Sequence, residues 1–175
     1  MIPAEEVVNR LPVTIRRRVK WGECDPAGVV YTPRFVDYVV EACLTFTELL
    51  VGAPLRQRLR ELDLDLPAKA VAVEFSRGLW PEQLFDMVIE VGEIRTRTFD
   101  LRIRATTVEG DALFDARFSP ICVRNGTREG CQIPERLRRE LESYRLRCEQ
   151  PRPEHQARPT ATTVADTEPE KGRTS

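Results

Sequence analysis

The most apolar stretch of the chain has the spacing of a long helix. Apolar residues fill most of positions 33–51, whereas the polar residues fall three or four positions apart on one narrow stripe. Those polar residues are Arg34, Asp37, Glu41, Thr45 and Glu48. Thr32 is typical of an N-cap and Pro33 of a first helical residue, and Gly52 suits the position after a helix end. The sequence therefore predicts a helix over 33–51 that is buried on most sides.

Alternation of apolar and polar residues predicts strands on both sides of this helix. One strand precedes it, and four follow it with short links. The predicted strands are 13–20, 68–76, 83–94, 98–109 and 112–124, with a hairpin turn at 109–111. Short links suit neighbouring antiparallel strands, whereas a doubly wound sheet would need a helix between each pair. The order predicts an α+β fold, in which a twisted antiparallel sheet wraps around the long central helix.

The remaining segments are more polar. Residues 55–66 are charged and amphipathic and suit either a short helix or a loop. Residues 134–147 predict a second helix on the surface, because Leu137, Leu141 and Tyr144 form only a thin apolar stripe. From residue 150 onward the chain is rich in Pro, Thr and Glu, which is typical of disorder. We therefore expect one domain over 1–149 and a disordered tail over 150–175.

Composition restricts the partners of this domain. The chain has 175 residues, of which 41% are apolar and 31% charged, and its net charge is −1. It has no overall basic field for nucleic acid, no charge-free membrane span and no apolar core of a signal peptide near its start. The five cysteines have the spacing of neither a zinc knuckle nor a dense disulfide framework. We expect reduced thiols in a cytoplasmic protein that binds neither nucleic acid nor membrane.

The position of the single histidine restricts the chemistry. His155 lies in the predicted tail, so a disordered tail would leave the folded domain without histidine. This argues against Ser-His-Asp and Cys-His catalysis and against His-rich metal sites. Acid–base work would then depend on carboxylates, Tyr, Lys or Cys.

The turn before the long helix joins a carboxylate to a helix N-terminus. Asp25-Pro26 favours a turn, and Gly28 permits backbone angles that other residues avoid. Asp25 lies seven residues before Thr32. A helix N-terminus offers free N–H groups and a partial positive charge. Together these groups could attack a carbonyl and stabilise the oxyanion that forms.

The same turn carries a family resemblance. The segment Gly22-Glu-Cys-Asp-Pro-Ala-Gly-Val-Val-Tyr31 resembles the signature of the 4-hydroxybenzoyl-CoA thioesterase family of hotdog-fold proteins. The family pattern is Gly-Asp-Cys-Asp-Pro-Ala-Gly, then apolar residues, an aromatic residue and a Pro. The resemblance extends more weakly to about Arg124.

The resemblance implies the hotdog fold and hydrolysis of an acyl-CoA thioester to free acid and coenzyme A. An aromatic acyl group such as 4-hydroxybenzoyl is one candidate. Coenzyme A enters as part of the substrate, and no metal or redox cofactor is implied. The resemblance also implies a homodimer or homotetramer, with sheets paired edge to edge and active sites at the interface.

The resemblance assigns roles to residues of the turn. Asp25 would attack the thioester carbonyl as a nucleophile or activate a water as a general base. The backbone N–H of Thr32 would polarise that carbonyl; some relatives have Tyr at this position, but the role belongs to the backbone. Gly28 and Tyr31 would shape the turn, and Tyr31 would also line the acyl pocket.

Two arginines are candidates for coenzyme A binding. The family has a basic cluster before a Ser-Phe pair, where it contacts coenzyme A phosphates. Here Arg95 and Arg97 precede Thr98-Phe99, and Thr96 replaces the middle basic residue. Guanidinium groups suit phosphate because they form bidentate, charge-assisted hydrogen bonds.

Several alternatives stay open. Other hotdog thioesterases use a carboxylate on the central helix, which makes Glu41 and Glu48 rivals of Asp25. Cys24 has no histidine to activate it and is interpreted as a packing residue. A hydratase or dehydratase would normally need a histidine with an Asp or Glu, and a domain without histidine argues against this interpretation. A non-catalytic acyl-CoA-binding hotdog protein would keep the fold without needing Asp25 as a free carboxylate.

Overall fold

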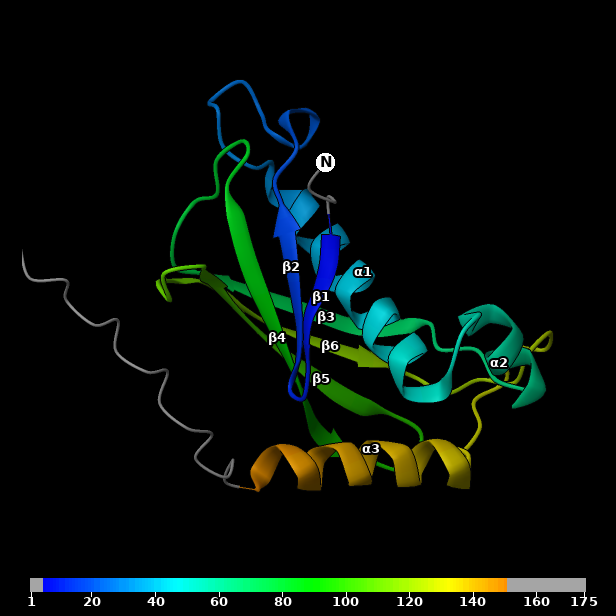
Figure 1. Cartoon of the computed structure of the whole chain (residues 1–175). Helices are drawn as coiled ribbons and strands as arrows, with labels where there is room; N and C mark the ends of the chain where they lie inside the picture. The colour runs from blue at the N-terminus through cyan, green and yellow to red at the C-terminus, as the bar shows by residue number, and fades with distance from the viewer. Residues whose placement is uncertain (1–4, 151–175) are drawn as a thin grey trace, which may run out of the picture.

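A computed structural model describes residues 5–150. Six strands form one antiparallel sheet in the order β1-β2-β4-β5-β6-β3. Their bounds are β1 Glu5–Arg10, β2 Val13–Arg18, β3 Ala68–Phe75, β4 Leu84–Ile94, β5 Phe99–Thr107 and β6 Ala112–Pro120. Strands β1 and β3 are therefore the two edges of the sheet. Figure 1 shows the sheet curving around the long helix α1.

Three α-helices and one short 3-10 helix complete the described part of the chain. They are the 3-10 helix Trp21–Glu23, α1 Thr32–Val51, α2 Leu55–Glu61 and α3 Glu135–Glu149. Helix α1 begins directly after the turn that carries Asp25. Helix α3 lies across the end of the sheet at the bottom of Figure 1, away from that turn. No single helix between residues 5 and 150 is long and apolar enough to cross a membrane; α1 and α2 meet that test only as a pair bent by 58°.

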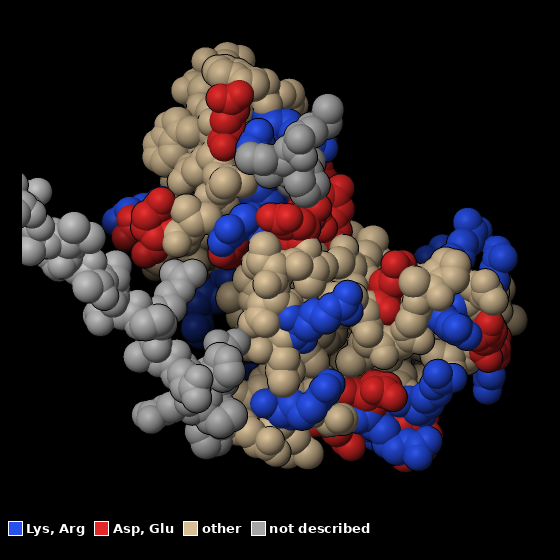
Figure 2. Space-filling model, in the orientation of Figure 1, with Lys and Arg blue, Asp and Glu red and all other residues tan. Residues whose placement is uncertain are grey.

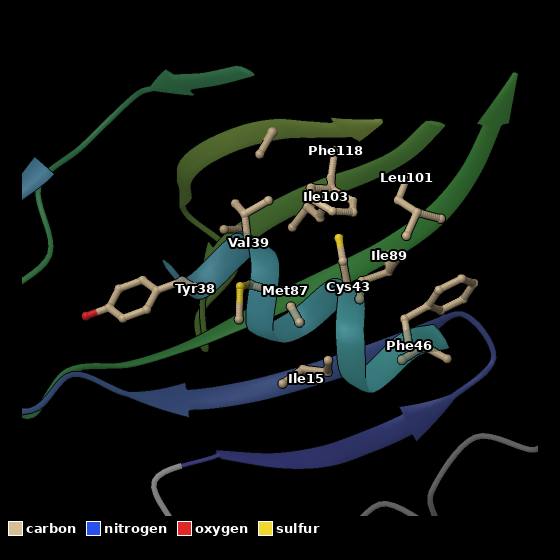
Figure 3. Close-up of a cluster of buried hydrophobic side chains, with 14 of the residues drawn as sticks. Ile15, Tyr38, Val39, Cys43, Phe46, Met87, Ile89, Leu101, Ile103 and Phe118 are labelled. Atoms are coloured by element: carbon tan, nitrogen blue, oxygen red, sulfur yellow. The ribbon is translucent and has the colours of Figure 1, made fainter. Parts of the chain in front are cut away.

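The core lies between α1 and the inward face of the sheet. Strands β2, β4 and β5 alternate buried and more exposed residues, as expected for a sheet that is packed on one face. Figure 3 shows Val39, Cys43 and Phe46 of α1 among the side chains of these strands. The labelled strand residues, all buried, are Ile15, Met87, Ile89, Leu101, Ile103 and Phe118. Full burial of one large apolar side chain contributes about 1.5–3 kcal/mol, so this layer supplies much of the folding free energy.

Tyr144 is one of the residues that attach helix α3 to the sheet. The hydroxyl of Tyr144 accepts a hydrogen bond from the Val13 N–H (2.7 Å) and donates one to the Ile89 carbonyl (2.8 Å). Its ring packs edge-on against Phe46, with ring centroids 4.9 Å apart. Tyr144 thus connects α3 to β2, β4 and α1.

The predicted helices and strands are present, with three differences. Strand β1 was not predicted, because the polar residues Glu5, Glu6, Asn9 and Arg10 hide the pattern of an edge strand. Helix α1 begins at Thr32, so Tyr31 and not Thr32 is the N-cap residue. The ambiguous segment 55–66 begins with the short helix α2. The predicted tail beyond Gln150, with His155, lies outside the described residues.

The prediction that α1 is buried on most sides is only partly correct. Val36 and Leu44 are 41% and 49% exposed. The reason is that the sheet ends at β3, so the sheet and helices of residues 5–150 leave one flank of α1 uncovered. An apolar flank of this kind is typical of a surface that a partner covers.

Replacement of Tyr144 tests the attachment of α3. Tyr144→Phe keeps the ring but leaves the Val13 N–H without its partner. An unsatisfied buried donor costs about 1–3 kcal/mol, so we expect the free energy of unfolding in a denaturant titration to fall by that amount. Tyr31→Phe, at an exposed ring, is the matched control and should leave stability unchanged. Equal stability of the two variants would contradict this role for Tyr144.

Candidate active site

The turn between β2 and α1 folds as a short hairpin. The Tyr31 N–H donates to the Glu23 carbonyl (3.0 Å), and the Asp25 N–H donates to the Val29 carbonyl (2.9 Å). The Gly28 N–H donates to the Asp25 carbonyl (2.9 Å) and closes the tip. We call residues 23–31 the signature hairpin. Its last residue, Tyr31, leads directly into α1, so hairpin and helix N-terminus form one unit.

Gly28 is required by the backbone conformation. Its φ is +80°, a region that side-chain-bearing residues rarely adopt, and a Cβ at this position would meet no atom within 4 Å. The constraint is therefore conformational and not one of space. This agrees with the predicted role of Gly28 in shaping the turn.

Asp25 has one oxygen that is held and one that is free. Its side chain is half-buried, and Oδ1 accepts a hydrogen bond from the Ala27 N–H (2.8 Å). Within residues 5–150, Oδ2 has no hydrogen-bond or ion-pair partner. The first bond fixes the orientation of the carboxylate, and the second oxygen can act on a substrate or a water.

The helix N-terminus also leaves one group free. The Tyr31 N–H is bonded within the hairpin, the Arg34 N–H donates to the Tyr31 carbonyl (2.8 Å), and Pro33 has no N–H. The Thr32 N–H has no hydrogen-bond partner in the described part of the chain. It is therefore the amide of this helix end that is available to a carbonyl oxygen, and the helix dipole strengthens it as a donor.

Exposed aromatic rings surround the hairpin. Trp21 lies in the 3-10 helix before it, and Tyr31 ends it. Trp80 belongs to the loop that follows β3. This loop is bonded to the hairpin, because the Val30 N–H donates to the Leu79 carbonyl (2.9 Å). Trp21, Tyr31 and Trp80 are 70%, 54% and 52% exposed. The two tryptophans were not predicted as site residues. Only the fold brings Trp80, in the loop after β3, to the hairpin, whereas Trp21 is already adjacent to the hairpin in the sequence.

A buried arginine lies behind the hairpin. Arg17 of β2 forms ion pairs with Glu5, Glu23 and Glu41. The hydroxyl of Tyr38 also donates to Glu23 (2.8 Å), and in Figure 3 this hydroxyl points away from the other labelled side chains. We call Arg17, Glu5, Glu23, Glu41 and Tyr38 the Arg17 cluster. In Figure 2, acidic and basic side chains lie next to one another in this part of the molecule.

The electrostatics of the cluster keep Glu23 ionised. Burial raises the pKa of Glu23, but hydrogen bonds from the Lys20 N–H, the Tyr38 hydroxyl and Arg17 outweigh that effect and hold the pKa below its usual value. The neighbouring Cys24 has the opposite shift. Burial and the charges of Glu23 and Asp25 raise the pKa of its thiol, so Cys24 is not an activated nucleophile.

The two rival carboxylates on α1 both have partners. Glu41 is bonded to Arg17, and its side chain is 51% exposed. Glu48 accepts a hydrogen bond from the Leu55 N–H (3.2 Å), at the start of α2. Each therefore has a structural contact, whereas Asp25 presents a free oxygen on the hairpin that leads into the free amide of Thr32.

The two predicted coenzyme A arginines differ in their surroundings. Arg95 forms a bidentate ion pair with Asp100 (both distances 3.0 Å) and a second pair with Glu93 (2.6 Å). The hydrogen bonds from Arg95 and from Ser119 lower the pKa of the buried Asp100 despite desolvation. Arg97 is exposed, and its guanidinium has no ion pair or hydrogen bond with any residue from 5 to 150.

Within one chain the structure does not bring these arginines to Asp25. Strand β4 begins with Leu84 paired to Arg18, beside the hairpin, and ends at Ile94, just before Arg95. Its eleven residues span about 35 Å at the usual rise of a strand. Arg95 and Arg97 therefore lie at the opposite end of the sheet from the signature hairpin.

Among the described residues, no three His, Cys, Asp or Glu side chains are grouped so that they could hold a metal ion.

Solved structures share this fold. A thioesterase superfamily protein from Jannaschia sp. CCS1 aligns with a TM-score of 0.71 at 19% identity, over 82% of this chain and 96% of that one. A 1,4-dihydroxy-2-naphthoyl-CoA thioesterase from Synechocystis aligns with a TM-score of 0.65 at 19% identity, over 73% and 93%. A mutant 4-hydroxybenzoyl-CoA thioesterase bound to 4-hydroxybenzoyl-CoA aligns with a TM-score of 0.65 at 21% identity, over 73% of this chain and 96% of that one.

The sequence comparisons agree with the fold. Comparison with curated protein sequences gives no match. The family model described as the thioesterase-like superfamily matches residues 19–141, which include the signature hairpin, α1 and four of the six strands. The predicted hotdog fold is confirmed, and the chain belongs to the thioesterase-like superfamily.

Proposed function

We propose that the protein hydrolyses an acyl-CoA thioester to a free acid and coenzyme A, with Asp25 as the catalytic carboxylate. The observation that carries this proposal is the pair of free groups on one unit: Oδ2 of Asp25 and the N–H of Thr32. Membership of the thioesterase-like superfamily supports the reaction class. The low identity to the solved structures leaves the substrate to be argued from the site.

The two free groups have complementary tasks. The thioester carbonyl oxygen accepts a hydrogen bond from the Thr32 N–H, which stabilises the negative charge that develops on this oxygen during attack. Asp25 then acts by one of two routes. As a nucleophile it attacks the carbonyl carbon, the C–S bond breaks to give a mixed anhydride and the coenzyme A thiolate, and water then cleaves the anhydride and supplies the proton for the thiolate. As a general base it takes a proton from a water that attacks the carbonyl directly; the C–S bond then breaks, and the carboxyl group returns the proton to the coenzyme A thiolate. Both routes consume one water and regenerate the carboxylate.

We propose an aromatic acyl group such as 4-hydroxybenzoyl as the substrate class. Trp21, Tyr31 and Trp80 place exposed rings around the hairpin, where an aromatic acyl group would gain stacking contacts. The solved structures with the same fold include thioesterases for 4-hydroxybenzoyl-CoA, gentisyl-CoA and 1,4-dihydroxy-2-naphthoyl-CoA. Their substrates are all hydroxylated aromatic thioesters.

We propose that the protein acts as a homodimer, with the sheets paired along β3, or as a tetramer of two such dimers. Strand β3 is an unpaired edge, and Val36 and Leu44 extend the exposed apolar surface on α1. Antiparallel pairing of β3 with its own copy turns the second chain end for end. The end of the partner sheet that carries Arg95 and Arg97 then lies on the same side as the signature hairpin. In this arrangement an arginine of one chain could bind the nucleotide of a coenzyme A whose acyl group lies at Asp25 of the other chain.

Substitution of Asp25 tests the central claim. Asp25→Asn keeps the size and the bond from Ala27 but removes the charge, the nucleophile and the base. Loss of a general base alone costs on the order of 10²–10⁴ in rate, so kcat in a thiol-release assay should fall by at least that factor. The melting temperature should be unchanged, because the amide oxygen still accepts the bond from Ala27.

The matched control is Glu41→Gln, at the rival carboxylate on α1. It should keep most of the activity. Activity that survives Asp25→Asn and collapses in Glu41→Gln would make the helix carboxylate the catalyst. A wild-type protein that binds acyl-CoA but hydrolyses none, across aryl and alkyl thioesters, would favour a non-catalytic acyl-CoA-binding protein.

The two arginines should respond differently to truncation. Arg97→Ala should raise KM for acyl-CoA on the order of 10-fold, because charge-assisted hydrogen bonds to phosphate are lost, and leave kcat unchanged. Arg95→Ala should mainly lower the melting temperature, because it leaves the buried Asp100 without its cation. The double variant should combine the two effects.

An acyl-pantetheine thioester, which lacks the nucleotide, is the control substrate. The KM effect of Arg97→Ala should disappear with it. An equal rise in KM for the two substrates would rule out a nucleotide contact for Arg97.

A further inference from the structure

Arg17 occupies a position that the strand pattern reserves for apolar residues. On the face of β2 that points to α1, its neighbours are Val13 and Ile15, and Val19 continues this face. Arg17 is 5% exposed. Burial of a guanidinium costs several kcal/mol unless partners compensate the charge, so a buried arginine here needs an explanation.

The partners of Arg17 come from three separate segments. Its Nη1 bonds Glu5 of β1 (2.7 Å) and also Glu41 of α1, and its Nη2 bonds Glu23 of the hairpin (2.9 Å). The guanidinium carbon lies 4.3 Å from the centre of the Tyr38 ring, in a cation–π contact. The planar fork of arginine can serve several carboxylates at once, which a lysine ammonium cannot do with the same geometry.

Glu23 connects this cluster to both ends of the signature hairpin. Its Oε1 accepts from Arg17, and its Oε2 accepts from the Lys20 N–H and the Tyr38 hydroxyl (both 2.8 Å). Its backbone carbonyl accepts a hydrogen bond from the N–H of Tyr31, which is the residue before Thr32. Asp25 follows two residues after Glu23. The position of Glu23 therefore affects the carboxylate of Asp25 near the tip of the hairpin and the free amide of Thr32 at its base.

We propose that Arg17 is a positioning residue, which holds Glu23 and through it sets Asp25 and the Thr32 N–H relative to each other. The proposal rests on the proposed function, because it gives the cluster a role in the hydrolysis. Arg17 touches neither substrate nor water in this role. Several carboxylates compensate the buried charge of Arg17, and one of them, Glu23, transmits its fixed position to the hairpin.

The test compares two glutamates that share the same arginine. Glu23→Gln weakens the link between Arg17 and the hairpin. Glu5→Gln removes a carboxylate from the same guanidinium, but Glu5 has no contact with the hairpin, so this variant is the matched control.

Two further variants test the other contacts of Glu23. Arg17→Lys keeps the positive charge but removes the planar guanidinium, and Tyr38→Phe removes one hydrogen bond to Glu23. Each full-length variant is assayed for melting temperature, for kcat and KM on the acyl-CoA that the wild type hydrolyses fastest, and for amide hydrogen exchange at Asp25 and Tyr31.

We expect Glu23→Gln to lower kcat on the order of 10-fold to 100-fold, the cost of a small misplacement of reacting groups, with little change in KM. Amide exchange at Asp25 and Tyr31 should become faster. Arg17→Lys should behave similarly, Tyr38→Phe should show a smaller effect in the same direction, and Glu5→Gln should match the wild type in kcat and exchange.

Equal losses of kcat in Glu23→Gln and Glu5→Gln would overturn the proposal, since they would show a general effect on stability. Unchanged kcat and exchange in Glu23→Gln would also overturn it. If Glu23→Gln does not fold, the comparison of Tyr38→Phe with Glu5→Gln decides. If the wild type hydrolyses no acyl-CoA, the proposed function fails, and amide exchange still decides whether the cluster holds the hairpin.

Discussion

The structure depends on the packing of one helix into one curved sheet. Helix α1 places Phe35, Tyr38, Val39, Cys43 and Phe46 against the inward face of the strands, and these residues belong to the hydrophobic core of the chain. Phe35 is the first large residue of this layer, and its ring lies 4.9 Å from Phe75 and 5.3 Å from Phe114. The N-terminal end of the helix is therefore anchored by aromatic contacts to β3 and β6. A helix fixed in this way provides a rigid base for the hairpin that precedes it.

The candidate site follows from that anchoring. A loop of nine residues would ordinarily sample many conformations, but the signature hairpin is held by backbone hydrogen bonds at its tip and base and by Glu23 from behind. Pro33 contributes by having no N–H, which leaves the amide of Thr32 as a single free donor. Catalysis by orientation and by aimed dipoles depends on this kind of local rigidity, because groups that move must be reordered at each turnover.

The sequence was sufficient to predict much of the fold and to single out Asp25 and Thr32, whose catalytic roles stay a prediction. The helical spacing of 33–51 and the period-2 strands are local patterns, and the turn residues around Asp25 are local signals too. What sequence reasoning missed depends on contacts between distant segments. Strand β1 is polar because it is an edge, and Arg17 resembles one of several basic residues on an exposed strand until Glu5, Glu23 and Glu41 come to it from three segments. Likewise, Arg95 and Arg97 look equivalent in sequence, and only the fold pairs Arg95 with Asp100 and leaves Arg97 free.

The unpaired edge of the sheet affects how the chain folds when other copies of it are nearby. Strand β3 carries two charged residues, Lys69 and Glu74, and is otherwise apolar over Ala68–Phe75. Its outer row of amide and carbonyl groups is a template on which any extended apolar segment could continue the sheet. Aggregation of newly made chains thus competes with folding, and its rate rises with chain concentration. Lys69 and Glu74 are the two positions in β3 whose charges oppose the addition of further strands at this edge.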